Sequence, residues 1–127
     1  MELEELTGKI IGAAIAVHRE LGPGFLESVY EEALCIELAE SGMKFRRQLV
    51  VPINYHGRQV GEHRLDLLVE DLVVVELKAV SAIEDIHFAI VRSYLKATDR
   101  QHGLLLNFAA PILTAKRVSR ERSARVA

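Results

Sequence analysis

Apolar residues recur at three- and four-residue steps in the first third of the chain, which predicts two helices. The first helix is expected to bury Leu6, Ile10, Ala13, Ala14, Val17 and Leu21. It should end at the segment LGPG (21–24), because glycine and proline interrupt helices. The second helix is expected over residues 25–42, where Gly42 suits the left-handed backbone of a helix end. The residues that it is expected to bury are Leu26, Val29, Tyr30, Ala33 and Leu34.

The middle of the chain, residues 45–80, is rich in β-branched side chains and predicts three antiparallel strands. Turn signals at His56-Gly57 and Glu70-Asp71 separate these strands. Pro52 has no backbone N–H to donate to a neighbouring strand. The first strand is therefore expected to be an edge strand or to carry a bulge.

A third helix is predicted over residues 82–99, followed by a short strand at 103–108. The helix is expected to bury Ile86, Ala89, Ile90, Tyr94 and Ala97. The strand, GLLLNF, is almost uniformly apolar, which is typical of a strand covered on both faces. The resulting order of helices and strands predicts a single-domain layer fold of the α/β or α+β class over residues 1–115. The remainder, residues 116–127, is predicted to be a flexible basic tail.

The composition is that of an ordinary globular domain. The chain has 127 residues, of which 50% are hydrophobic and 27% charged. This length fits one domain with a real core. No apolar run approaches the roughly 20 residues that a membrane helix needs. Cys35 is the only cysteine, which excludes an internal disulfide and a cysteine zinc cluster. These features predict a cytoplasmic protein that does not enter a membrane.

The net charge of −2 gives no overall attraction to nucleic acid, but the charges are unevenly distributed. The first forty residues hold nine acidic side chains against Lys9 and Arg19. The segment from Lys116 to Arg125 holds five basic residues against Glu121 alone. A basic tail can contact phosphates, although a solvated segment is the commoner outcome.

Two carboxylates and an ammonium interrupt the apolar hairpin: Asp66, Glu76 and Lys78. A two-residue loop at 70–71 would place the two carboxylates on opposite faces of the sheet. A three-residue loop at 70–72, or one bulge, would pair Asp66 with Glu76. Their Cβ atoms would then lie roughly 4.5–5.5 Å apart, where like charges destabilise a sheet. Such a pair requires a cation, either Lys78 or a divalent metal.

A magnesium ion would fit this arrangement, because Mg²⁺ takes one or two carboxylates and completes its shell with water and phosphate oxygens. A bound metal activates water and polarises a phosphoryl group, and a neighbouring lysine can stabilise developing charge. The alternative is an exposed sheet face with salt-bridged, solvated charges. On spacing alone this alternative is favoured, because the pattern is short and its residues are common.

Several short motifs occur together, in order, along most of the chain. Gly24, Glu27 and Tyr30 form a G-x-x-E-x-x-Y pattern, preceded by VHRELGPG and followed by YEEAL, LLVEDLVVVELKAV and SYLKATD. With these motifs, from about residue 6 to about 113, the chain resembles the bacterial GxxExxY protein family, which is assigned to the PD-(D/E)XK nuclease superfamily.

The resemblance implies a central mixed β-sheet flanked by helices, and a Mg²⁺ or Mn²⁺ site. Asp66 and Glu76 would be metal ligands and Lys78 the catalytic lysine. Related nucleases also place an acidic residue of the first core helix in the metal shell, which Glu27 or Glu31 matches. The alternative for both is structural, because glutamate at the start of a helix is stabilised by the helix dipole.

One segment departs from the family pattern. Members commonly have an H-E-A-Q-like segment after the E-x-K strand, whereas this chain has HFAI, with Phe88 and Ile90 in place of polar residues. Two functions therefore stay open. One is metal-dependent cleavage of nucleic acid, by an endo- or exonuclease whose site is partly degenerate. The other is a non-catalytic binding module that keeps the nuclease fold. A homodimer is compatible with either, given the high apolar content.

Two histidines receive separate interpretations. His18 occupies a partly apolar position in the first helix, where a hydrogen-bonded core histidine is commoner than a ligand. His87 stands near the start of the third helix, where a capping or surface role is the usual one.

Overall fold

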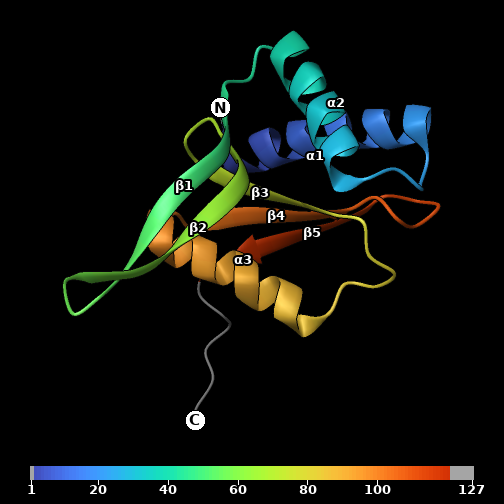
Figure 1. Ribbon diagram of the computed structural model, residues 1–127. Coiled ribbons are helices and arrows are strands. Elements are labelled where there is room, and N and C mark those ends of the chain that lie inside the picture. The colour runs from blue at the N-terminus through green and yellow to red at the C-terminus, as the bar shows by residue number, and fades with distance from the viewer. Residues whose placement is uncertain (1, 121–127) are drawn as a thin grey trace.

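The protein is described by a computed structural model covering residues 2–120 (Figure 1). Three helices and five strands follow one another as α1 (Leu3–Leu21), α2 (Glu27–Glu40), β1 (Phe45–Tyr55), β2 (Arg58–Val69), β3 (Val73–Lys78), α3 (Asp85–Thr98), β4 (His102–Asn107) and β5 (Thr114–Ser119). No helix among these residues is both long and apolar enough to cross a membrane.

The strands form one mixed sheet in the order β1-β2-β3-β4-β5. Strands β1, β2 and β3 pair antiparallel, as predicted, and α3 carries the chain across to β4, which pairs parallel to β3. β5 returns antiparallel to β4. β1 lies at an edge, where the missing N–H of Pro52 breaks no inner ladder. The predicted fold class, a central mixed sheet flanked by helices, is confirmed.

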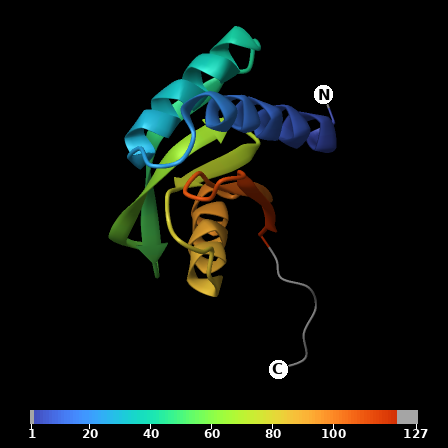
Figure 2. The ribbon, with the colours of Figure 1, turned by 90° about the vertical axis from the view of Figure 1, so that its right-hand side faces the viewer.

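The sheet has helices on both faces. In Figures 1 and 2, α1 and α2 lie over one face and α3 lies against the other, while the β1–β2 ribbon extends beyond the rest of the sheet. Side chains of β3 alternate between these layers. Val73, Val75 and Leu77 pack towards α1 and α2, whereas Val74 packs towards α3. Two apolar clusters, one on each face, therefore stabilise the sheet.

The C-terminal boundary predicted at residue 115 is wrong. Lys116, Arg117 and Ser119 belong to β5, which pairs with β4 over six positions, His102↔Ser119 to Asn107↔Thr114. The sequence did not indicate this strand, because most of its residues are polar. β5 lies at an edge of the sheet, and Val118 is its one buried residue. The rest of the predicted tail, residues 121–127, lies outside the described residues.

Two helices present a different face to the core from the one predicted. In α2, Tyr30 and Leu34 are buried as predicted, but Leu26 is 76% exposed and Val29 is 38% exposed, since the helix begins only at Glu27 and also rests on Leu38. In α3, Ile86 is 59% exposed, whereas Val91 and Leu95 are buried. Both helices carry apolar residues on more than one side, so periodicity alone did not determine which side meets the sheet.

Helix α3 approaches the sheet closely at Gly103 of β4, where a Cβ would lie 2.9 Å from Val91 Cγ1 and 3.3 Å from the Val74 carbonyl oxygen. Gly103→Ala should therefore lower the free energy of unfolding by about 1–3 kcal/mol through overpacking. Urea denaturation measures this change. Gly12→Ala is the matched control, because open space surrounds Gly12 in α1 and alanine should stabilise the helix by roughly 0.5–1 kcal/mol. Equal effects of both substitutions would contradict the prediction.

Candidate active site

The turn between β2 and β3 sets the register of the two acidic strands. Glu70 and Asp71 both have positive φ (52° and 56°), and the Leu72 N–H donates to the Val69 carbonyl at 3.0 Å. Leu72 is an extra residue, because Val69 pairs with Val73. Of the two loop lengths that the sequence left open, the structure has the three-residue one. This register brings Asp66 opposite Glu76.

At Asp66 and Glu76, side-chain carboxylates accept the hydrogen bonds that backbone carbonyls accept in the rest of the β2–β3 pair. The β2–β3 ladder ends at Leu67↔Val75. Beyond it, the Asp66 N–H donates to Glu76 Oε1 at 3.0 Å, and the Leu77 N–H donates to Asp66 Oδ2 at 2.9 Å. Each carboxylate thus accepts a backbone N–H from the strand opposite its own. The two acids consequently lie side by side in the gap where β2 and β3 separate.

The environment of this pair disfavours two negative charges. Glu76 is only 3% exposed. Burial, with a further contribution from the Asp66 charge, raises the pKa of Glu76 to about 8. Burial also raises the pKa of Asp66, against the opposing effect of its bond from the Leu77 N–H. The Lys78 charge acts to lower both pKa values, and Lys78 follows Glu76 by two residues on β3, so both side chains project from the same face of the strand. Without a further cation, the site carries a proton at neutral pH.

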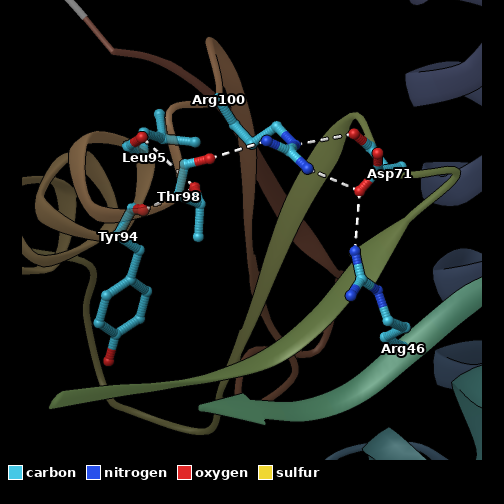
Figure 3. Close-up of polar contacts among 6 residues, drawn as sticks. All are labelled: Arg46, Asp71, Tyr94, Leu95, Thr98 and Arg100. Atoms are coloured by element: carbon cyan, nitrogen blue, oxygen red, sulfur yellow. Dashed lines mark hydrogen bonds and ion pairs between the residues drawn. The ribbon is translucent and has the colours of Figure 1, made fainter. Parts of the chain in front are cut away.

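The turn that sets this register is anchored by two arginines (Figure 3). Asp71 Oδ1 accepts from Arg46 Nη2 at 2.9 Å and from Arg100 Nη2 at 2.6 Å. Arg100 also donates to the backbone carbonyls of Asp71 (2.8 Å) and Thr98 (2.7 Å). Arg100, with Arg46, holds the pKa of Asp71 below its usual value. The turn is thus tied both to β1 and to the end of α3.

Glu31 and Glu27, the two predicted helical ligands, differ in their environment. Glu31 is buried and accepts from Arg47 Nη2 at 3.0 Å and from Gln48 Nε2 at 2.8 Å. Glu27 is exposed at the start of α2. Partial burial raises the pKa of Glu27, and the Lys78 charge acts in the opposite direction. Glu31 is therefore engaged in an ion pair with Arg47, whereas Glu27 is exposed and its pKa responds to the charges of Lys78 and Asp66.

Gln48 is a site residue that the sequence analysis missed. It is skipped in the β1–β2 ladder and has a positive φ of 48°. Its side-chain amide bridges Glu31 (2.8 Å) and Asp66 Oδ1 (3.4 Å). The distortion of β1 thus joins α2 to the acidic pair. A single polar residue in a strand gave no signal of this role.

The G-x-x-E-x-x-Y pattern has a structural explanation. Gly24 has a φ of 111°, a region that favours glycine. The Tyr30 hydroxyl donates to the Gly22 carbonyl at 2.6 Å and accepts from the Phe25 N–H at 3.1 Å. The Tyr30 ring stacks on Phe108 with centroids 4.5 Å apart. The loop before α2 is fixed in this way, and with it the position of Glu27, the first residue of the helix.

Helix α3 adds Tyr94 to the site, although the sequence analysis assigned this residue only to the core. Burial raises the pKa of Tyr94, and the negative charges of Glu76 and Asp66 raise it further. Tyr94 also packs against the apolar cluster between α3 and the sheet, which contains Leu65, the neighbour of Asp66 in β2. In Figure 3, the Tyr94 side chain extends away from the Asp71–Arg100 contact. Its ring meets His63 edge-on, with centroids 4.4 Å apart.

The two residues that depart from the family pattern have different surroundings. Phe88 packs against the apolar cluster between α3 and the sheet. It is therefore part of the core. Ile90 is half-buried and lies one helical turn before Tyr94, so these two residues share a face of α3.

His18 and His87 have structural partners. His18 is buried, with Nε2 2.8 Å from the Ala110 carbonyl oxygen. The Glu84 N–H donates to His87 Nδ1 at 2.8 Å, which caps the start of α3. Both histidines therefore have the hydrogen-bonded roles favoured in the sequence analysis.

The donor set fits a magnesium-like ion only as a two-carboxylate site. Among residues 2–120, no group of three or more His, Cys, Asp or Glu side chains is arranged to hold a metal. Asp66 and Glu76 supply oxygen donors, which hard cations prefer, and Mg²⁺ often binds to one or two carboxylates with water completing its shell. Hydrogen bonds from opposite strands orient both carboxylates.

Comparisons with known proteins agree with this architecture. A family model described as the PD-(D/E)XK nuclease superfamily matches residues 4–121. The crystal structure of SSO0001 is similar, with a TM-score of 0.59 and 14% identity over 76% of this chain and 50% of that one. So is an alkaline exonuclease (LHK-Exo) from Laribacter hongkongensis, with a TM-score of 0.55 and 14% identity over 86% of this chain and 68% of that one. At this identity, both likenesses show the fold alone. The chain spans half the length of SSO0001. A search of curated proteins finds no match.

Proposed function

The chain belongs to the PD-(D/E)XK nuclease superfamily, and from this premise we propose that it hydrolyses phosphodiester bonds in nucleic acid with a divalent metal held by Asp66 and Glu76. Nucleases of this superfamily generally use divalent metals. The observation that carries the proposal is the reciprocal contact of Asp66 and Glu76 across the gap between β2 and β3. The resemblance to the GxxExxY family, a homodimer and a cytoplasmic location stay predictions.

Each residue has a separate task in the proposed reaction. Mg²⁺ or Mn²⁺ would supply an activated water and polarise the phosphoryl oxygen. Asp66 and Glu76 hold the cation and are oriented by backbone N–H groups. Lys78 offers its ammonium group to the negative charge that develops on the phosphoryl oxygens. Glu27, at the start of α2, would add a negative charge outside the two direct ligands, where it interacts with the charges of Lys78 and Asp66.

Metal binding and cleavage test this proposal directly. Labelled single- and double-stranded DNA and RNA are incubated with the protein in Mg²⁺, Mn²⁺ or EDTA, and calorimetry measures Mn²⁺ binding. We expect Mn²⁺ to bind to one class of site, and we expect cleavage of the nucleic acid that EDTA abolishes. Absence of both metal binding and cleavage would overturn the proposal.

A second candidate, a non-catalytic nucleic-acid-binding module, is favoured by Ile90. This residue shares the Tyr94 face of α3 but cannot orient a water or bind a phosphate. Nucleic acid bound without cleavage in any metal would support the module. Ile90→Gln distinguishes a weakened nuclease from a lost one, since a gain in cleavage rate is expected only where the metal site is intact.

Glu27 and Glu31 should respond differently to substitution. Glu27→Gln should weaken Mn²⁺ binding about tenfold, and leave the free energy of unfolding within roughly 0.5 kcal/mol of wild type. Glu31→Gln should instead cost about 1–2 kcal/mol of stability, because it removes the partner of Arg47 and an acceptor of Gln48. Calorimetry and urea denaturation of both variants measure these effects. The reverse pattern would assign the metal shell to Glu31.

A further inference from the structure

A cavity lies between α3 and the outer part of the β1–β2 ribbon. Its volume is about 470 Å³, and its lining includes Ile53, Asn54, His63, Ser93 and Lys96. This volume falls within the range of small-ligand sites. Another cavity, of about 510 Å³, is lined by α1, β4 and β5, and none of these elements carries a proposed metal ligand.

Strand β2 contributes a residue to both the cavity and the acidic pair. His63 precedes Asp66 by three residues on β2, a spacing of roughly 10 Å along a strand. The His63 ring contacts Tyr94, whose pKa is raised in part by the charges of Glu76 and Asp66. Tyr94 follows the lining residue Ser93 on α3 and contacts the lining residue His63. A strand of nucleic acid rises about 3.4 Å per nucleotide, so this distance spans a few nucleotides.

The lining offers the groups that a nucleotide requires. Ile53 and Pro52 provide an apolar wall for a base, and Asn54 an amide that can pair with a base edge. Lys96 is exposed and offers an ammonium group to a phosphate. None of the described lining residues is acidic. This cavity can therefore accept an anionic ligand. The acidic pair, by contrast, repels anions through its own carboxylates.

His63 is prepared to act as a hydrogen-bond acceptor. The Ser93 hydroxyl donates to the Ile90 carbonyl at 2.6 Å, so it accepts from His63 Nε2, 3.1 Å away. Burial lowers the pKa of His63, which favours the neutral ring. In this tautomer the other ring nitrogen, Nδ1, can accept a donor from a base or sugar.

We propose that this cavity binds a nucleotide of the substrate strand, a few positions from the phosphodiester that is cleaved, with Lys96 on its phosphate and Asn54 on its base. This inference rests on the proposed nuclease function. It assigns a substrate-positioning role to residues that neither hold the metal nor touch the reacting phosphate.

Salt-dependent binding tests this assignment. The probe is a fluorescein-labelled single-stranded DNA 12-mer, and fluorescence anisotropy gives its dissociation constant in Ca²⁺ over a series of KCl concentrations. Lys96→Ala should weaken binding about tenfold and reduce the slope of log affinity against log salt by about 0.7, the value for one phosphate contact on a single strand. Asn54→Ala should weaken binding about fivefold and leave the slope unchanged. Both residues are exposed, so the fold is retained.

Lys9→Ala is the matched control, because Lys9 is exposed on α1, over the opposite face of the sheet. It removes the same charge and should leave both affinity and slope unchanged. If wild type binds and the Lys96 and Lys9 variants have the same slope, the subsite is overturned and the nuclease proposal stands. If wild type neither binds nor cleaves any oligonucleotide, the nuclease proposal fails, and the subsite fails with it.

Discussion

Replacing Glu76 with glutamine should lower the rate of metal-dependent phosphodiester cleavage by about a thousandfold. The amide keeps the size of the side chain and can still accept from the Asp66 N–H, but it supplies no charge to the cation. A loss of about 4 kcal/mol of transition-state stabilisation corresponds to this factor. Initial rates on the best nucleic-acid substrate, at saturating Mn²⁺, measure the effect.

Glu40→Gln is the control for this substitution, because Glu40 is exposed in the last turn of α2, away from the acidic pair. It should cleave at the wild-type rate. If the Glu76 variant and the control cleave at similar rates, Glu76 is not part of the active site, and the proposed metal arrangement is wrong.

The same substitution should stabilise the metal-free protein at alkaline pH. Glu76 has a pKa of about 8 in the folded state against a reference value of 4.5. Between these values the folded state binds the extra proton, so the free energy of unfolding of wild type falls as pH rises. Glutamine does not titrate. Near pH 4.5 the two proteins should be similarly stable, and by pH 9 the variant should be more stable by an amount on the order of a few kcal/mol.

Urea denaturation in EDTA at several pH values measures this difference. Adding Mn²⁺ at pH 8 should stabilise wild type, since a ligand that binds only the folded state shifts the equilibrium towards it. The variant should respond much less. A stability difference that is independent of pH would mean that Glu76 is not held in a charge-disfavouring environment. Glu76→Gln is thus expected to raise stability and to lower activity, a trade-off that is typical of functional sites.

Much of the fold could be predicted, because local chemistry determines it. The β-branched segment and its two turns gave the three antiparallel strands, and the apolar segment at 103–108 gave β4. β5 was missed because a partly exposed edge strand carries polar residues and lacks the apolar signal. The buried face of α3 was wrong because Ile86 and Val91 are both apolar, and only contact with the sheet distinguishes them.

The candidate site could be predicted in its residue types but not in its geometry. The hairpin pattern named Asp66, Glu76 and Lys78, and the family resemblance added Glu27 and Glu31. It did not distinguish Glu27 from Glu31, because their difference depends on Arg47, which lies sixteen residues away from Glu31 in the sequence. Gln48 and Tyr94 were not assigned to the site. Their approach to Asp66 requires a distorted strand and a helix placed against the sheet.

The sequence by itself determined the order of the elements, the acidic hairpin and the glycine and tyrosine that position the start of α2. These depend on neighbouring residues and on side-chain periodicity, which a linear sequence contains. Only the tertiary structure decided whether Asp66 and Glu76 meet. Their register depends on one extra residue, Leu72, in a turn that Arg46 and Arg100 hold from 25 and 29 residues away. Contacts over such separations arise only when the chain has folded, since no local preference selects between the two registers.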